Sequence, residues 1–256
     1  MIALITGASS GIGREMAKNL ATRGVNLILV ARRTERLIEL KDEIKFNCPG
    51  VKVKTITADL SKQQQCFDLY DRVKDYRIDF LFNNAGFGLY GAFTETDLNE
   101  ELTMIDVNIK AVHILTKLFL RDFTERNSGY ILNTASVAGF MPGPLLATYY
   151  ATKNYVVQLT KAIYEELRST GSRVVISALC PGPVNTEFNA VAGVKAFGMP
   201  AESEAYVADY AIERLLCGDL LIIPGMTTKA AAAGSRFAPT KLLLRTVRTI
   251  QEQKNR

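Results

Sequence analysis

Short apolar runs alternate with segments of helical periodicity along most of the chain. Seven runs read as strands buried on both faces, at 2–5, 26–31, 52–57, 80–82, 130–134, 173–179 and 220–223. Apolar residues recur at helical spacing between them, at 13–23, 33–46, 62–74, 99–123, 147–169 and 203–216. Apolar strands joined through helices are typical of a parallel sheet that is covered on both faces. The pattern predicts an α/β fold with one doubly wound sheet of seven parallel strands.

Length and composition agree with one globular domain. The chain has 256 residues, of which 48% are apolar and 22% charged, close to the averages of folded proteins. No run reaches about 18 uncharged apolar residues, the length that a membrane-spanning helix needs. The first strand begins at residue 2, which leaves no room for a signal peptide, so we expect a cytoplasmic protein.

The sequence offers no pattern of metal ligands. The four cysteines, Cys48, Cys66, Cys180 and Cys217, are scattered and form no C-x-x-C pair, and His113 is the single histidine. Neither a disulfide framework nor a thiolate or imidazole metal site is indicated, so we expect no bound metal. We expect His113 to be a structural or interface residue.

The net charge of +5 belongs to the C-terminal end. Residues 229–256 carry a net charge of +6, which leaves residues 1–228 at −1 and argues against nucleic acid as a partner. From Pro239 to Ile250 the sequence reads as a short basic amphipathic helix with Leu243, Leu244 and Val247 on one face. We expect this face to pack on the body or on a second subunit. Contact with an anionic membrane surface is the alternative, which we do not favour.

A glycine-rich turn, Thr6-Gly7-Ala8-Ser9-Ser10-Gly11-Ile12-Gly13, joins the first strand to the first helix. Its glycines allow the backbone to approach a pyrophosphate closely, and the N-terminus of the helix favours an anion. Residues 7–11 also match G-x-S-x-G, the nucleophile elbow of hydrolases. In that fold the serine follows several strands, and His113 would be its only base. We therefore favour dinucleotide binding.

Further motifs follow in order along the chain: Asn83-Asn84-Ala85-Gly86 after the fourth strand, Ser136 after the fifth, Tyr149 and Lys153 on one helix, and Pro181-Gly182 after the sixth strand. Together with the turn, they resemble the T-G-x-x-x-G-x-G, N-N-A-G, Y-x-x-x-K and P-G motifs of the short-chain dehydrogenase/reductase family. The resemblance implies a single-domain Rossmann fold and an oxidoreductase that acts on CH–OH or C=O groups. It also implies a dinucleotide-binding and catalytic domain over 1–225, followed by a basic, helical extension over 226–256.

The resemblance implies the roles of individual residues as well. The catalytic set would be Asn108, Ser136, Tyr149 and Lys153, in which Asn108 holds a water that relays protons and Lys153 holds the nicotinamide ribose. Besides Tyr149 and Lys153, the cofactor would contact Gly7, Ser9, Ser10, Gly11, Ile12, Gly13, Asp59, Leu60, Asn84, Ala85, Gly86, Pro181, Gly182, Val184 and Thr186.

The spacing of Tyr149 and Lys153 supports this chemistry independently. Residues four apart share one face of a helix. A phenol has a pKa of about 10, and a nearby ammonium favours its phenolate form, so the pair suits general acid/base catalysis. Ser136 follows a parallel strand, at the sheet edge where α/β proteins bind ligands. Tyr150 points about 100° away from Tyr149 on a helix, and we expect it to pack in the interior.

The end of the second strand indicates which dinucleotide is bound. NAD-binding folds usually carry an acid there, whereas this chain has Ala31 followed by Arg32 and Arg33. Guanidinium groups bind phosphate bidentately, so we predict a preference for NADP(H), with NAD(H) as the second choice and Arg32 as the first candidate for the 2′-phosphate. The alternative is that both arginines only begin a solvated helix. Ser10 stands where many NADP-preferring relatives have a basic residue, a role that Arg14 could partly fill.

These features predict an NADP(H)-dependent oxidoreductase that reduces a carbonyl, or oxidises the corresponding alcohol, of an apolar small molecule. We expect the substrate walls at 86–93 and 137–146 and in a loop at about 184–200, which includes Phe197. Steroids, oxoacyl thioesters and other apolar ketones remain open. The rival function is a non-enzymatic NADP(H)-sensing regulatory protein, which commonly lacks the tyrosine or the lysine.

The family resemblance also implies a homodimer or homotetramer. In the family the helices that correspond to 99–123 and 147–169 commonly pair across a two-fold axis. Both segments carry apolar residues beyond one narrow face, namely Ile105, Val112, Leu115, Phe119, Val156, Leu159 and Ile163.

Overall fold

The computed structural model describes residues 1–193 and 201–253. Its seven strands form one sheet in the order β3-β2-β1-β4-β5-β6-β7, and all neighbouring strands are parallel. The strands are β1 (Ile2–Thr6), β2 (Asn26–Ala31), β3 (Val53–Thr57), β4 (Phe80–Asn83), β5 (Tyr130–Thr134), β6 (Val175–Leu179) and β7 (Leu221–Ile222). The predicted doubly wound parallel sheet is confirmed.

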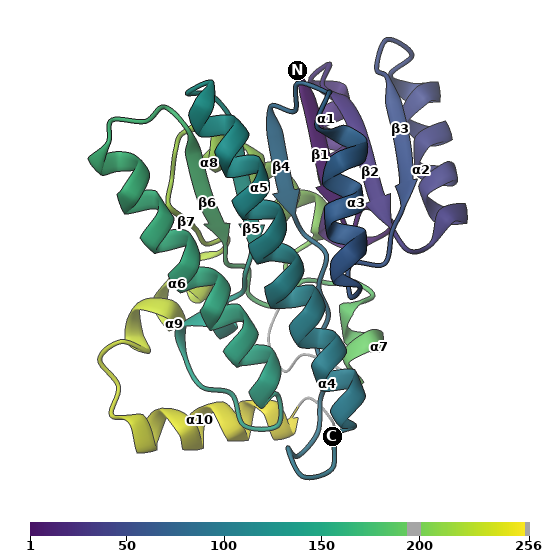
Figure 1. Cartoon of the computed structure of the whole chain (residues 1–256). Coiled ribbons are helices and arrows are strands. Elements are labelled where there is room, and N and C mark those ends of the chain that lie inside the picture. Colours follow the sequence, from purple (N-terminus) through teal and green to yellow (C-terminus); the bar gives the residue numbers. More distant parts are fainter. Residues whose placement is uncertain (194–200, 254–256) are drawn as a thin grey trace.

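Helices cover both faces of this sheet (Figure 1). One face packs against α1 (Gly11–Thr22), α2 (Thr34–Asn47) and α8 (Glu204–Leu216), and the other against α3 (Gln63–Val73), α5 (Val112–Glu125) and α6 (Ala147–Ser169). Side chains of β2 alternate between the two cores, with Leu27 and Leu29 in one and Ile28 and Val30 in the other. Strands such as β2 read as continuous apolar runs because they are buried on both sides, whereas Lys54 and Thr57 of the edge strand β3 are exposed.

The segment predicted as one helix over 99–123 changes its pitch in the middle. It consists of α4 (Leu98–Ile105), the π-helical turn η1 (Asp106–Ala111) and α5. Apolar residues keep a helical period through all three, which is why the sequence pattern does not reveal the turn. Insertions of π-helix often mark functional sites, and this one carries Asn108.

The predicted substrate loop is only partly described. It contains a short helix, α7 (Phe188–Ala192), which follows Thr186 and Glu187. Residues 194–200, including Phe197, lie outside the described residues. A single turn of 3₁₀ helix, η2 (Val137–Phe140), follows Ser136 at the end of β5.

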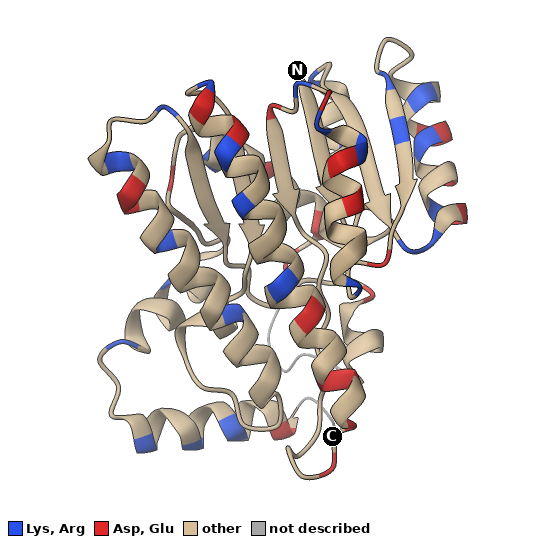
Figure 2. Cartoon of the chain, viewed as in Figure 1, with Lys and Arg blue, Asp and Glu red and all other residues tan. Residues whose placement is uncertain are grey.

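Beyond the last strand the chain forms α9 (Met226–Gly234) and α10 (Thr240–Gln253). Leu243 and Val247 of α10 pack against Leu146 and Tyr150, so the predicted apolar face is covered by the body. The basic residues of α10 lie on its outer side, where Lys241, Arg245 and Arg248 are exposed (Figure 2). Within the described chain, every helix is too short or too polar to cross a membrane.

The apolar residues on the long helices that suggested self-association lie mostly inside this chain. Four of the seven residues, Val112, Leu115, Phe119 and Val156, are buried within this chain, because the helices turn these residues toward the sheet. Ile105, Leu159 and Ile163 are half-buried. Most of the extra apolar residues therefore belong to the core.

Candidate active site

A cavity of about 370 Å³ lies at the carboxyl ends of the strands. It is lined by the turn after β1, by the residues that follow β2, β3, β4, β5 and β6, and by α6 and the first part of α7. β1 lies between β2 and β4, so the chain crosses from one side of the sheet to the other at this point. Parallel α/β sheets bind their ligands at such a switch point.

The glycine turn has the close backbone approach that a dinucleotide requires. Gly7 and Gly11 have φ of +65° and +60°, a conformation that favours glycine. A Cβ on Gly7 would lie 2.8 Å from the Cα of Ala85, so the turn and the N-N-A-G segment could not approach each other this closely with any other residue there. The turn leads into the N-terminus of α1, whose free N–H groups suit a pyrophosphate. These features fit a dinucleotide.

Asn84 fastens the turn to β4. Its backbone N–H donates to Oγ1 of Thr6 at 3.0 Å, and its side-chain amide donates to the carbonyl oxygens of Thr6 and Gly7 at 3.3 and 3.4 Å. Gly13, predicted to contact the cofactor, is buried behind the turn and does not line the cavity. A Cβ at this position would overlap the Asn84 side chain and the Gly7 carbonyl. The absence of a side chain at Gly13 therefore allows Asn84 to pack against the turn.

Tyr149 and Ser136 meet at the inner end of the cavity. Tyr149 is half-buried on the first turn of α6, and its ring lies 5.3 Å from that of Phe188, centroid to centroid. Ser136 is buried at the end of β5 and accepts a hydrogen bond from the backbone N–H of Ala138. Burial raises the pKa of Tyr149, and hydrogen bonding with Ser136 acts in the opposite direction. The phenol is therefore protonated at neutral pH in the absence of other charges.

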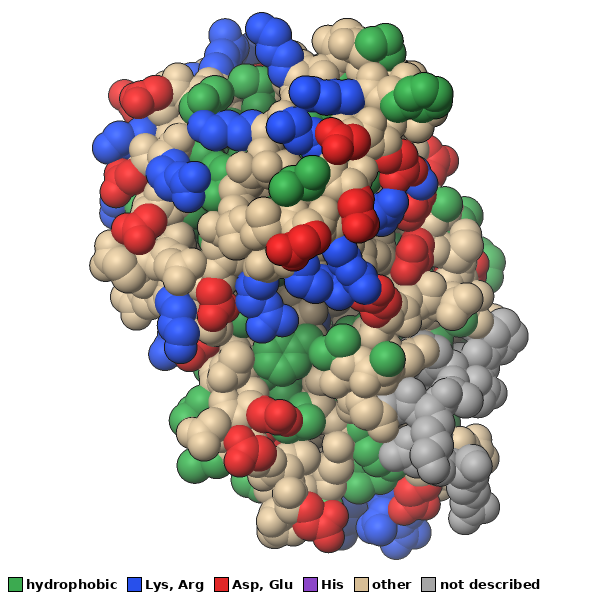
Figure 3. Space-filling view, turned by 90° about the vertical axis from the view of Figure 1, so that its right-hand side faces the viewer, with side chains coloured by type: hydrophobic (Ala, Val, Ile, Leu, Met, Phe, Trp, Pro, Cys, Tyr) green, Lys and Arg blue, Asp and Glu red, His purple; other side chains and the backbone are tan. Residues whose placement is uncertain are grey.

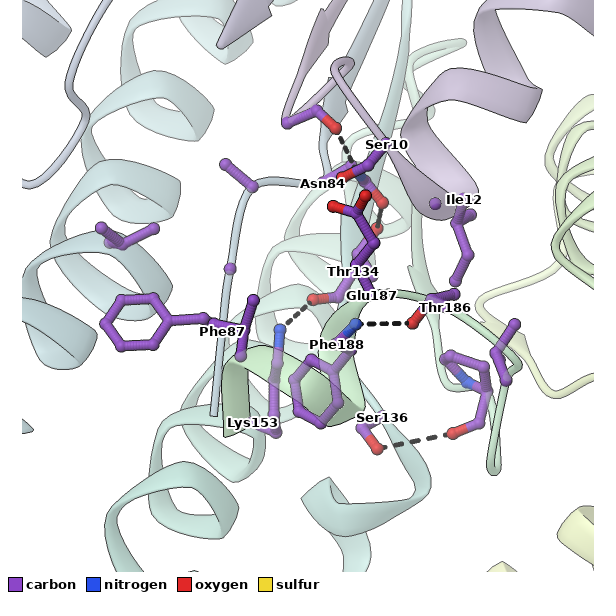
Figure 4. Close-up of a pocket in the computed structure, with 18 of the residues that line it drawn as sticks. Ser10, Ile12, Asn84, Phe87, Thr134, Ser136, Lys153, Thr186, Glu187 and Phe188 are labelled. Atoms are coloured by element: carbon purple, nitrogen blue, oxygen red, sulfur yellow. Dashed lines mark hydrogen bonds between the residues drawn. The ribbon is translucent and has the colours of Figure 1, made fainter. Parts of the chain in front are cut away.

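Lys153 lies one helical turn after Tyr149 and is 4% exposed. Its Nζ donates to the carbonyl oxygen of Thr134 at 2.8 Å (Figure 4). The same nitrogen lies 5.8 Å from the centre of the Tyr149 ring. Burial lowers the pKa of Lys153 to about 8. Among the described residues no carboxylate pairs with this ammonium, which therefore retains free donors toward the cavity.

Asn108 is fully buried in the π-helical turn, directly behind the cavity. Its Oδ1 accepts from the N–H of Phe87 at 3.1 Å, while its Nδ2 donates to the Phe87 carbonyl and to Oγ1 of Thr152. A Cβ on Gly86 would lie 2.9 Å from Asn108 Oδ1 and 3.3 Å from Lys153 Nζ. Gly86 thus leaves open the space between the amide and the ammonium.

Two arginines, Arg32 and Arg33, directly follow β2 at one end of the cavity. Both Arg32 and Arg33 line it, and Arg33 donates to the hydroxyl oxygens of Ser9 at 3.1 Å and Ser10 at 2.7 Å. Arg14, considered as a partial substitute for a basic residue in the turn, instead pairs with Glu43 of α2. Of the two arginines, Arg33 is the one whose guanidinium lies over the phosphate turn.

The other predicted cofactor residues fall around the same cavity. The lining includes Ser9, Ser10, Gly11, Ile12, Asp59, Leu60, Ala85, Gly86, Pro181, Gly182, Val184 and Thr186. Of the expected substrate walls, Phe87 and Phe188 line it, together with Leu146 and Tyr150. Tyr150 is also buried and accepts a hydrogen bond from Gln251 of α10, which agrees with the predicted packing role.

Two residues of the site were missed by the sequence argument. Thr134 supplies the carbonyl oxygen that holds Lys153, and Glu187 forms ion pairs with Arg33 and Arg36. Thr134 ends a strand two residues before Ser136, which is a usable signal. The sequence around Glu187 contains no comparable signal, because the arginines that pair with it lie more than 150 positions away in the chain.

His113 has no part in this site. It is exposed on α5, and its Nδ1 lies 2.7 Å from the hydroxyl of Tyr155 rather than near the serines of the turn. The described residues contain no group of His, Cys, Asp or Glu that could hold a metal ion.

Comparisons with known proteins agree with the geometry. A family model described as short chain dehydrogenase matches residues 1–195. An uncharacterized oxidoreductase of Staphylococcus epidermidis is 36% identical over 187 residues, which are 72% of this chain and 78% of that protein. A short-chain dehydrogenase from Sphingobium yanoikuyae in complex with NADPH has a TM-score of 0.84 and 31% identity, over 92% of this chain and 93% of that chain. A short-chain dehydrogenase/reductase from Burkholderia phymatum in complex with NAD has a TM-score of 0.81 and 28% identity, over 91% of each chain. The chain therefore belongs to the short-chain dehydrogenase/reductase family of oxidoreductases.

Proposed function

We propose that the protein uses NADP(H) to reduce a carbonyl of an apolar small molecule, or to oxidise the corresponding alcohol, with Tyr149 as the general acid/base. One observation carries the proposal: the phosphate turn and the side chains of Ser136, Tyr149 and Lys153 line a single cavity. A dinucleotide that extends from the turn along the edge of the sheet ends beside a protonated phenol.

A bound nicotinamide would supply a hydride to the carbonyl carbon, or accept one from the alcohol carbon in the reverse direction. Ser136 donates a hydrogen bond to the carbonyl oxygen of the substrate. Tyr149 gives its proton to that oxygen as the π electrons of the carbonyl move onto it, and in the reverse direction the phenolate takes the proton back. The ammonium of Lys153 favours the phenolate and holds the nicotinamide ribose. Asn108, held by its bonds to Phe87 and Thr152, faces the space beside Lys153 where a water would return the proton.

The preference for NADP(H) rests on Ala31, Arg32 and Arg33. No carboxylate stands at the end of β2 to repel a 2′-phosphate, and both guanidinium groups line the cavity. Arg32→Ala and Arg33→Ala should each raise the Kd of NADPH more than that of NADH, and Arg33→Ala should have the larger effect. Equal losses for both nucleotides would make the arginines structural.

The lining beyond the nicotinamide end is apolar. Phe87, Leu146, Phe188 and Val191 lie there beside Tyr149, which supports an apolar substrate body next to the reacting carbonyl. Oxoacyl thioesters, steroids and other apolar ketones satisfy this requirement equally.

A substrate panel tests the proposed function. Hydrophobic ketones and oxoacyl thioesters are mixed with the protein and NADPH, and turnover is followed by the loss of NADPH absorbance, with NADH as the comparator. We expect turnover that is higher with NADPH. Tight binding of NADPH without turnover of any substrate would instead favour the regulatory sensor.

A further inference from the structure

Glu187 links two chain segments that both line the cavity. It directly follows Thr186 and precedes α7, and its carboxylate pairs with two arginines at the beginning of α2. The Oε2 atom lies 2.9 Å from Nη1 of Arg33, and Oε1 accepts a hydrogen bond from Nη1 of Arg36. Basic and acidic side chains lie next to each other near the middle of one face of the molecule (Figure 3).

All three nitrogens of the Arg33 guanidinium make hydrogen bonds. One nitrogen, Nη1, pairs with Glu187, while Nη2 donates to the hydroxyls of Ser9 and Ser10 and Nε lies 3.3 Å from that of Ser9. Glu187, Arg33 and both serines line the cavity at the end of β2. An anion that binds the Arg33 guanidinium in the cavity therefore comes close to the Glu187 carboxylate, which is already bonded to that guanidinium.

The charge on Glu187 is maintained at neutral pH. Hydrogen bonds from Arg36 and Arg33 lower the pKa of its carboxyl group. A 2′-phosphate carries about −1.5 to −2 charges near pH 7, so it would compete with the carboxylate for the guanidinium groups and be repelled by it. The 2′-hydroxyl of NAD(H) is neutral and has no such conflict.

We propose that Glu187 is a specificity-determining residue that lowers the preference for NADP(H) over NAD(H), because it occupies the arginines that a 2′-phosphate needs. The inference rests on the proposed binding of the 2′-phosphate by Arg33. Binding of NADP(H) then includes the breaking of two partly exposed ion pairs, while binding of NAD(H) leaves them in place.

Glu187→Gln tests the proposal, with Glu35→Gln as the matched control. Glu35 is an exposed acid on the first turn of α2, and it forms no ion pair with another described residue. The Kd values of NADPH and NADH are measured from the fluorescence of the reduced nicotinamide. Glu187→Gln should lower the Kd of NADPH by about 3- to 10-fold, because two exposed ion pairs no longer compete, and leave that of NADH within about twofold. Glu35→Gln should change the ratio of the two Kd values by less than about twofold.

Arg33→Ala separates this inference from the proposed function. If Arg33→Ala weakens both nucleotides equally, the assignment of the 2′-phosphate to Arg33 is wrong. If it weakens NADPH selectively while Glu187→Gln leaves the ratio unchanged, the cofactor assignment stands and the role of Glu187 is overturned. In an Arg33→Ala/Arg36→Ala background, Glu187→Gln should give a smaller gain for NADPH, because only the repulsion between the carboxylate and the phosphate is then relieved. A gain of the same size there would also overturn the role, since it would reflect general charge removal.

Discussion

Tyr149 and Tyr150 are neighbours in the chain but have different surroundings. The Tyr149 ring lies beside Phe188 at the inner end of the cavity, whereas the Tyr150 hydroxyl is bonded to Gln251 of the last helix. Tyr149→Phe should retain nucleotide binding and lose more than about 99% of kcat, since only the proton carrier is removed. Tyr150→Phe should lower kcat less than about tenfold. Steady-state turnover and nucleotide titration of both variants check this, and an active Tyr149→Phe with a dead Tyr150→Phe would reverse the assignment.

Lys153 gives the reaction a pH dependence of definite sign. Its pKa of about 8 means that the ammonium is charged at neutral pH, where it favours loss of the proton from the neighbouring phenol. Alcohol oxidation uses the phenolate of Tyr149, so kcat for oxidation should rise with pH. Lys153→Met should move this rise to higher pH by about 1–3 units, because an ammonium no longer favours the phenolate. The measurement is kcat at saturating NADP⁺ from about pH 6 to 10. If the pH dependence of kcat is the same in Lys153→Met, Lys153 serves only to bind the ribose.

At the scale of elements, the last helix packs against side chains that line the active-site cavity. Val247 is 4% exposed and packs with Leu146 and Tyr150, and Tyr90 donates to the carbonyl oxygen of Gln251 at 3.4 Å. Val247→Ala should reduce the free energy of unfolding by roughly 1–3 kcal/mol, because it leaves a cavity beside these side chains. Thr246→Ala, on the exposed side of α10, should change it by less than about 0.5 kcal/mol. Thermal unfolding of the two variants compares them, and equal stability would mean that α10 is only loosely attached.

At the scale of the whole molecule, we predict that the chain forms a homodimer or homotetramer. The apolar residues that remain accessible on the α4 to α6 side include Leu98 and Leu102, which are 68% and 49% exposed. Leu102→Glu should lower the molar mass in light scattering, because a charge would have to be buried between subunits. Phe46→Glu, at an 86% exposed position on α2, is the control and should leave the mass unchanged. A wild-type monomer at every concentration would contradict the prediction.

The sequence by itself determined the features whose physical cause is local. Strands buried on both faces must be apolar throughout, so β2 and β5 were predicted with their observed bounds. Gly7 and Gly11 were recognised because their backbone conformation favours glycine, and Tyr149 and Lys153 because a helix brings residues four apart together.

The tertiary structure alone decided what depends on segments distant in the chain. Three contacts form only in the completed fold and are encoded by no local pattern. They are the ion pair of Glu187 with Arg33, the hydrogen bond from Lys153 to the Thr134 carbonyl, and the packing of α10 against Tyr150. The π-helical turn at Asn108 is of the same kind, because its apolar period equals that of an ordinary helix and only packing against Phe87 and Thr152 distinguishes it.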